Sequence, residues 1–223
     1  MYSRDMVRHM KKSFLVIGMG RFGKSVAVEL KKLGNEVLAV DEKEEHFSEI
    51  DDYVSGTVLA DCRDEESLRA LNVEDFDAVV LSIASDVETS ILTAVLLKEL
   101  GAKYLMAKAQ SDLHAKVLLK VGADKIILPE HDMAIRVAHA LNHPTFMDVM
   151  SFGDALGIVE MRCPAGWANK SLKELNLNKK YKINIIAARN ETRVSAPLDG
   201  DYVLSSEDMI LMIGATDVFS KLG

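Results

Sequence analysis

Three glycines near the start of the chain have the spacing of a phosphate-binding turn. Gly18, Gly20 and Gly23 follow the apolar run Phe14–Ile17 in the pattern G-x-G-x-x-G. Such a turn lets the backbone approach a pyrophosphate, and it directs the free N–H groups of a helix start towards the anion. The spacing alone does not decide the matter, because short glycine patterns arise by chance in many turns.

An acidic residue supports the nucleotide interpretation. Asp41 ends the next apolar run, Glu36–Val40. An acid about 20 residues beyond the glycines is placed to bind the hydroxyls of a ribose. The alternative role, a cap for the following helix, does not account for the glycine turn upstream. We therefore expect the turn and Asp41 to bind one nucleotide.

Four further candidates lie where the next two apolar runs end. Asp61 could contact an adenine amino group or cap the helix that follows it. Cys62 is close to the expected nucleotide, although a small buried side chain is the simpler interpretation. Ser82 and Ile83 end the fourth run, where ligands of doubly wound sheets bind.

The charged candidates bear on the number of phosphates. Arg21 lies inside the turn, next to Phe22. Its guanidinium would add a bidentate donor for phosphate, which favours ATP or ADP over a nicotinamide ligand. The alternative interpretation is that Arg21 points to solvent or pairs with a surface acid. Lys108 could reach phosphate or ribose, or lie on the surface. Glu130, directly after Pro129, could support a helix N-terminus or help to hold a phosphate-bound Mg²⁺ or Ca²⁺ ion.

The elements that position these residues alternate regularly between residues 13 and 128. Apolar runs predict strands at 14–17, 37–40, 57–60, 78–83, 104–107 and 125–128. Amphipathic or apolar segments predict helices at 21–33, 44–53, 64–71, 87–100, 112–121 and 130–141. This alternation predicts a Rossmann-like α/β fold, a doubly wound parallel sheet with the strand order 3-2-1-4-5-6.

The last third of the chain has a different pattern. Short strands are expected at 158–162, 183–189, 193–196 and 209–213, with small helices near 172–175 and 216–222. We expect a nucleotide-binding domain at 13–144, a linker at 145–157 and a small α+β domain at 158–223. A domain of this size buries little surface alone, so docking or dimerisation is expected.

Composition narrows the class of protein. Hydrophobic residues make up 48% and charged residues 27%, as in ordinary globular proteins, and the net charge of -7 argues against a nucleic-acid partner. Two cysteines suggest no disulfide framework and therefore a reducing cytosol. No apolar run reaches the ~20 residues that cross a bilayer, and residues 1–12 lack the apolar region of a secretory signal. We expect a cytoplasmic protein.

Catalytic groups are scarce. A dehydrogenase usually needs a proton donor in its substrate domain, yet the sequence after residue 144 contains no histidine. We therefore expect no enzyme; the alternative is a small NAD(H)-binding oxidoreductase or redox sensor.

Several linked motifs resemble one family. Residues 14–23, 37–41, 107–110 and 122–130, with Asp132-Met133 after them, resemble the RCK domain, also called the KTN domain. Residues 171–175 and 180–186 resemble the RCK C-terminal domain. Together they resemble the cytosolic subunit of Ktr/Trk (TrkA-type) potassium uptake systems, over residues 13–223.

The resemblance implies a regulatory subunit without enzymatic activity. Such subunits form homodimers and then an octameric gating ring, peripheral to the membrane beneath a potassium-translocating subunit, and ATP and ADP compete for the cleft. By resemblance, the three glycines line the phosphates and Asp41 binds the ribose. Arg21 reads the terminal phosphate across a dimer interface. Lys108 and Glu130 lie near the nucleotide, and Glu130 is the candidate ligand of a divalent cation.

A second ligand follows from the same resemblance. Several relatives bind cyclic di-AMP in the C-terminal domain, and Asn184, Ile185, Ile186 and Pro197 stand in the matching segment. Some relatives have an arginine six residues before the asparagine, where this chain has Asn178. The alternative is that these residues only form strand core and turn.

Overall fold

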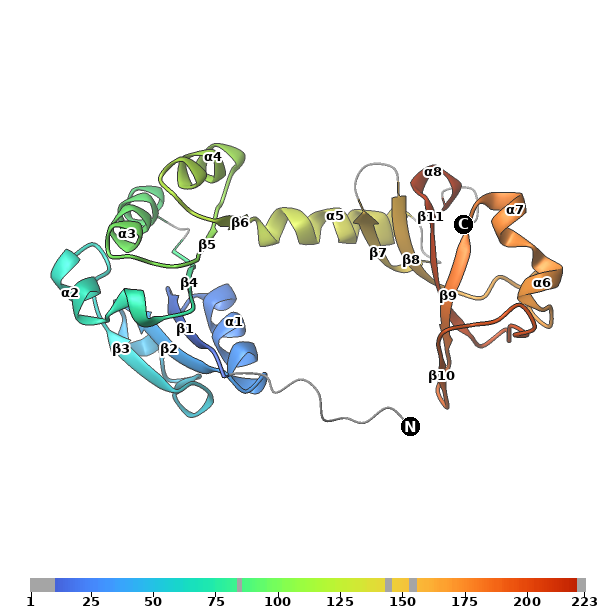
Figure 1. Ribbon diagram of the computed structural model, residues 1–223, viewed down its shortest axis with the longest axis horizontal. Coiled ribbons are helices and arrows are strands. Elements are labelled where there is room, and N and C mark those ends of the chain that lie inside the picture. The colour runs from blue at the N-terminus through green and yellow to red at the C-terminus, as the bar shows by residue number, and fades with distance from the viewer. Residues whose placement is uncertain (1–10, 84–85, 143–145, 153–155, 220–223) are drawn as a thin grey trace. The chain divides into compact units, whose positions relative to one another are not determined.

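The computed structural model describes residues 11–83, 86–142, 146–152 and 156–219. The chain divides into two compact units, Met1–Pro129 and Glu130–Gly223 (Figure 1). Each unit is described by itself. Within the described residues, no helix combines the length and apolar character needed to cross a membrane.

The first unit contains a six-stranded parallel sheet in the order β3-β2-β1-β4-β5-β6. Its strands are β1 (Ser13–Ile17), β2 (Glu36–Asp41), β3 (Gly56–Leu59), β4 (Ala78–Leu81), β5 (Leu105–Lys108) and β6 (Lys125–Ile127). The predicted fold class and strand order are confirmed. The order places the ends of β1, β2 and β3 side by side, and these ends carry the glycine turn, Asp41 and Asp61.

Helices connect these strands. They are α1 (Arg21–Lys32), α2 (Glu65–Ala70), α3 (Val87–Glu99) and α4 (Asp112–Lys120), with 3-10 turns η1 (Glu44–His46), η2 (Asp51–Tyr53) and η3 (Val73–Asp75). Two 3-10 turns thus replace the helix expected at 44–53. Phe47, Ile50 and Val54 are buried there; their helical spacing is satisfied by successive tight turns as well as by one helix.

Alternating side chains of β1 belong to separate cores on the two faces of the sheet. Leu15 and Ile17 belong to a core that also contains Leu97 of α3. Val16 belongs to the other core, with Ala27 of α1. A strand that is covered on both faces must be apolar at every position, which explains the continuous apolar run before the glycine turn.

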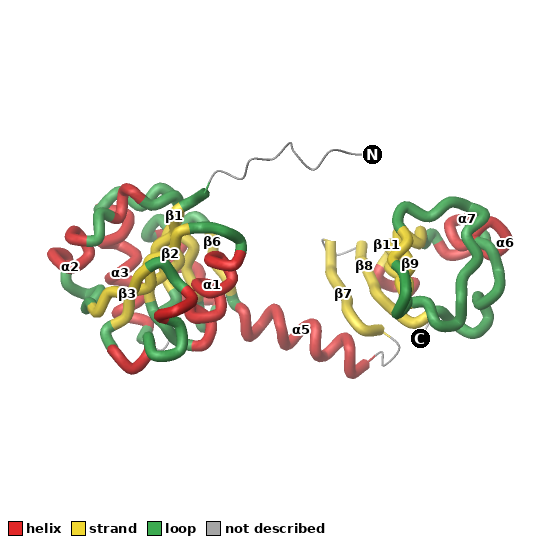
Figure 2. Tube along the Cα trace, turned by 90° about the horizontal axis from the view of Figure 1, so that it is seen from below, coloured by secondary structure: helices red, strands yellow, loops and turns green. Residues whose placement is uncertain are grey.

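The second unit contains an antiparallel sheet in the order β10-β9-β11-β8-β7. Figure 2 labels β9, β11, β8 and β7 of this sheet. The elements of the unit are α5 (Pro129–Asn142, which begins at the last residue of the first unit), β7 (Phe146–Phe152), β8 (Leu156–Arg162), α6 (Leu172–Leu175), α7 (Leu177–Tyr181), β9 (Asn184–Arg189), β10 (Val194–Ser195), β11 (Met209–Ala215) and α8 (Thr216–Phe219). Its core includes Ile183, Leu204 and Ile210.

Two elements of this unit differ from the expected layout. Strand β7 lies inside the 145–157 range expected as a linker, and it pairs antiparallel with β8. Helix α7 follows α6 after Asn176, whose φ of 48° is left-handed. Both depend on contacts within the unit. Strand β7 pairs with β8, and α7 buries its own first residue, Leu177, in the core.

Candidate functional site

The glycine turn is required by backbone geometry and packing. Gly18 has a φ of +91°, and a Cβ there would lie 3.0 Å from the carbonyl carbon of Ser82. A Cβ on Gly23 would lie 1.9 Å from the carbonyl oxygen of Gly18, which no side chain can tolerate. Gly20 differs, because a Cβ there would have no atom within 4 Å. Glycine is therefore needed at the first and third positions for the turn itself.

The start of α1 favours an anion. Gly20 is the N-cap residue, and the first turn carries no acidic residue. Unpaired N–H groups at a helix start bear partial positive charge and attract phosphate. The backbone N–H of Gly18 donates to the Val40 carbonyl at 2.8 Å, which joins the turn to the end of β2.

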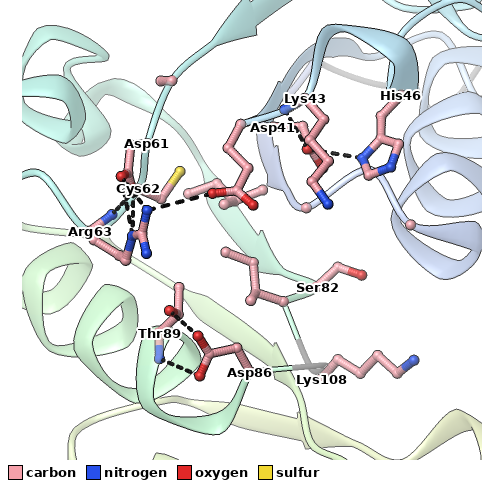
Figure 3. A pocket seen from close by; sticks show the side chains of 16 residues that line it. Asp41, Lys43, His46, Asp61, Cys62, Arg63, Ser82, Asp86, Thr89 and Lys108 are labelled. Carbon is pink, nitrogen blue, oxygen red and sulfur yellow. Dashed lines mark hydrogen bonds and ion pairs between the residues drawn. The ribbon is translucent and has the colours of Figure 1, made fainter.

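A cavity of about 320 Å³ opens where the turn meets the ends of the strands (Figure 3). It brings together these predicted residues: Gly18, Gly20, Asp41, Asp61, Cys62, Ser82, Ile83 and Lys108. It is also lined by residues that the sequence did not single out: Ile17, Glu42, Lys43, His46, Ala60, Arg63, Asp86 and Thr89. The volume is at the lower end of the range for small-molecule sites.

The other predicted residues do not line this cavity. Gly23 is buried behind the turn, and Arg21 is exposed at the first position of α1. The ring of Phe22 lies 5.8 Å from Lys108 Nζ, within the range of a cation–π contact. Glu130 lies in the first turn of α5 and belongs to the second unit.

Asp41 is buried and holds the turn. Its Oδ2 accepts the backbone N–H of Met19 at 2.6 Å, and its Oδ1 accepts that of Lys43 at 2.9 Å. His46 Nδ1 also lies 2.9 Å from Oδ1. The side chain does not cap η1, whose N-cap is Lys43 without a side-chain bond. A carboxylate has about four lone-pair sites, so with these three neighbours Asp41 can accept one ribose hydroxyl in addition.

Asp61 is bound to a neighbouring arginine. Arg63 donates through Nε to Asp61 Oδ1 at 2.9 Å and through Nη2 to Oδ2 at 2.7 Å. These bonds hold the pKa of Asp61 below its usual range. The helix-capping alternative is not what the structure shows, because Asp64 caps α2 and accepts the Ser67 N–H at 2.9 Å.

Cys62 is buried and its thiol is protonated. Burial raises its pKa to about 12, and the negative charge of Asp61 contributes. Its carbonyl accepts a hydrogen bond from Thr93 Oγ1 at 3.1 Å. A neutral thiol is a poor nucleophile, so Cys62 acts as a small buried side chain at the cavity wall.

Asp86 is a lining residue that sequence reasoning missed. It caps α3: its Oδ1 accepts the N–H of Glu88 at 3.0 Å, and its Oδ2 accepts Thr89 Oγ1 at 2.6 Å. The hydrogen bonds from Thr89 keep the pKa of Asp86 low. An acid directly before the apolar helix is an N-cap signature that could have found it.

No three His, Cys, Asp or Glu side chains converge as a metal site among the residues that the structure describes. A cation at Glu130 would therefore need further ligands, such as phosphate oxygens.

A second cavity, of about 360 Å³, lies within the second unit. Asn184 and Ile185 line it, whereas Ile186 and Pro197 do not. Asn178 Nδ2 donates to Asn184 Oδ1 at 2.8 Å. The side chain of Asn178 is therefore engaged with Asn184 itself.

Known families match nearly the whole chain. The TrkA-N domain matches residues 14–129, and the TrkA-C domain matches residues 158–222. The Ktr system potassium uptake protein C of Bacillus subtilis is 39% identical over 95% of this chain and 96% of its own length. The chain therefore belongs to the family of TrkA-N and TrkA-C domain proteins that includes this Ktr system protein. The Ktr system potassium uptake protein A of the same organism is 35% identical over 94% of both chains.

Solved structures show the same fold. A GsuK channel bound to NAD matches with a TM-score of 0.63 and 14% identity, over 96% of this chain and 39% of the other. GsuK bound to ADP matches with a TM-score of 0.52 and 12% identity, over 61% of this chain and 36% of the other. This chain therefore covers less than half of the length of those GsuK chains. At this low sequence identity, the similarity shows a shared fold only.

Proposed function

We propose that this family member is a cytosolic regulatory subunit that senses adenine nucleotides and controls a membrane potassium-translocating subunit. The relatives named Ktr system potassium uptake proteins support the coarse role, since they match almost end to end. The observation that carries the nucleotide role is the glycine turn joined to the buried carboxylate of Asp41. The protein works at the cytoplasmic face of the membrane and contacts it through its partner.

ATP and ADP are the proposed ligands, and NAD(H) is the competitor. The turn and Asp41 suit all three, because each has a pyrophosphate and a ribose. Arg21 favours the ligands with more terminal phosphate charge. It is exposed and does not line the cavity of its own subunit, which fits a role in reading the terminal phosphate of a nucleotide in a neighbouring subunit of a ring.

Switching requires an interaction that ATP makes and ADP does not. The γ-phosphate, bridged by Arg21 and by a Mg²⁺ or Ca²⁺ ion that Glu130 helps to hold, supplies one. A difference of about 5.5 kcal/mol in binding two states moves a population from 1:99 to 99:1. Ligand-dependent gating thus needs no chemical step.

We also propose a site for cyclic di-AMP in the second unit. The cavity at Asn184 and Ile185 supports a ligand site. The bond from Asn178 to Asn184 means that this chain offers an amide where an arginine would offer a charged donor. We therefore expect any cyclic di-AMP binding to be weaker than in relatives with the arginine.

The function is tested in vesicles that hold a Ktr-type potassium-translocating subunit. Potassium flux is measured after adding the full chain with ATP, ADP or no nucleotide. The proposal expects co-purification with the membrane subunit and a flux that differs between ATP and ADP. Equal flux under all three conditions, or steady oxidation of NADH by the chain alone, would contradict it.

A further inference from the structure

The cavity crosses the carboxyl ends of three adjacent strands in a fixed order. The glycine turn follows β1, Asp41 ends β2, and residues 60–63 follow β3. Backbone bonds join neighbours along this line, from Gly18 N–H to the Val40 carbonyl at 2.8 Å and from Ala60 N–H to the Asp41 carbonyl at 3.0 Å. A nucleotide with phosphates at the turn and ribose at Asp41 would place its base at residues 60–63.

Arg63 is the planar group at that end. Its Nε and Nη2 make paired bonds to the two carboxylate oxygens of Asp61, and the backbone N–H of Arg63 also donates to Asp61 Oδ1 at 2.9 Å. Such a paired contact fixes the plane of the guanidinium as well as its position. The side chain is about half exposed, at 52%, and lines the cavity. Figure 3 shows it beside Asp61, away from Asp41 and His46.

We propose that Arg63 determines base specificity by stacking its guanidinium on the purine ring of a bound nucleotide, with Asp61 as its positioning residue. This inference rests on the proposed nucleotide site. It replaces the expectation that Asp61 contacts the adenine amino group, because Arg63 makes four hydrogen-bond contacts with that carboxylate, which has about four acceptor sites.

The local charges favour a base over a phosphate as the partner. Arg63 Nη2 lies 3.7 Å from Glu42 Oε2 in addition to its contacts with Asp61. A guanidinium next to two carboxylates carries no surplus positive charge with which to attract phosphate. Its face, in contrast, can stack on an aromatic ring, and arginine does so more readily than lysine. The apolar side chains of Ala60 and Ile83 line the same cavity and suit the buried part of a base.

The test compares ligands that differ only in the base. ATP, GTP and CTP share the ribose and the triphosphate, and their affinities for the full chain are measured by competition. In Arg63→Ala, the affinity for ATP and GTP falls about threefold to thirtyfold, the range of a cation–π contact. CTP, with one small ring, loses less. The ratio of ATP to CTP affinity therefore falls.

Further variants separate stacking from charge. Arg63→Lys keeps the charge and loses the planar group, so its ATP to CTP ratio falls below the wild-type value towards that of Arg63→Ala. Asp61→Asn lowers the ratio in the same direction, because the guanidinium is no longer held. Arg69→Ala is the matched control: Arg69 pairs with Glu65 on α2 and does not line the cavity. Its ratio stays at the wild-type value.

The possible failures are distinguishable. Equal losses for ATP, GTP and CTP in Arg63→Ala would show contact with ribose or phosphate and would overturn the inference. An unchanged ratio in every variant would also overturn it. If the wild-type chain bound no nucleotide at all, the proposed function itself would fail. Thermal unfolding of each variant shows whether a loss of binding is a loss of fold.

Discussion

The Asp41 carboxylate accepts the backbone N–H of Met19 at 2.6 Å, between the first two glycines of the turn. The residue placed to bind the ribose therefore also shapes the loop that binds the phosphates. Because both residues are buried, this hydrogen bond is protected from water and couples the two halves of the site.

Asp41→Ala tests that coupling. The variant leaves the N–H of Met19 without its acceptor, and an unsatisfied buried donor costs about 1–3 kcal/mol of unfolding free energy. The affinity for ATP and the affinity for ADP fall by about the same factor as each other, because both nucleotides contain the ribose that Asp41 is proposed to bind. Urea unfolding and calorimetric titration measure the two effects. Asp51→Ala, an exposed acid in the same connection, is the control; wild-type affinity in Asp41→Ala would refute the coupling.

The glycine turn permits a matched pair of alanine variants. In Gly23→Ala the new Cβ would lie 1.9 Å from the Gly18 carbonyl oxygen, so the turn and α1 must separate. Overpacking of this kind typically costs about 1–3 kcal/mol, and nucleotide binding falls with it. Gly20→Ala has open space and keeps wild-type stability. Equal stability of the two variants, measured by urea unfolding, would contradict this geometry.

Cys62 should resist thiol reagents. Its pKa is raised to about 12 by burial, so at pH 8 almost none of it is thiolate, the form that reacts. Mass spectrometry after alkylation of the native protein is expected to show Cys62 unmodified, and the same protein in urea to show it labelled. Rapid native labelling would instead favour the redox-sensor alternative.

Acid should destabilise the first unit. The pKa of Asp124 is lowered, mainly because it accepts the Leu105 N–H at 2.7 Å, and that of Asp77 mainly because it accepts the Ser13 N–H at 2.8 Å. A lowered folded pKa means stability that is present above the unfolded value, about 3.9, and is lost as pH falls through the folded pKa.

Urea unfolding between pH 6 and pH 2 measures this loss. The midpoint is expected to fall mainly below about pH 4. The double variant Asp77→Asn/Asp124→Asn starts less stable and depends less on pH over that window. Glu99→Gln, at an exposed position on α3, keeps the wild-type dependence. An equally steep dependence in the double variant would refute the assignment.

The first sheet was predictable because its signals are local. The continuous apolar runs at Leu15–Ile17 and Val79–Leu81 are buried on both faces, and the six strands follow the predicted order. Asp41 was predictable for a similar reason, since it directly ends a strand. By contrast, β7 is held by pairing with β8, which the order of residues alone does not reveal.

The polar half of the cavity was less predictable. Arg63 lines the cavity because it is bound to Asp61, and His46 lines it because it contacts Asp41. Neither residue belongs to a motif with a fixed spacing. Asp61, for which an adenine contact or a helix cap was expected, lines the cavity, and its carboxylate accepts hydrogen bonds from Arg63. Side-chain partners across a turn depend on rotamers and burial, which spacing does not encode.

The central claim is that this family member distinguishes nucleotides by their number of phosphates. The most direct measurement is calorimetric competition among ATP, ADP and NADH on the wild type, Arg21→Ala and the control Lys32→Ala. Lys32 lies in the last turn of the same helix and pairs with Glu29.

We predict that the wild type binds ATP and ADP more tightly than NADH. In Arg21→Ala, ATP affinity falls about tenfold or more, the value of a charge-assisted hydrogen bond, while ADP affinity stays nearly unchanged and Lys32→Ala behaves as wild type. Equal losses for ATP and ADP in Arg21→Ala, or a wild type that prefers NADH, would contradict it.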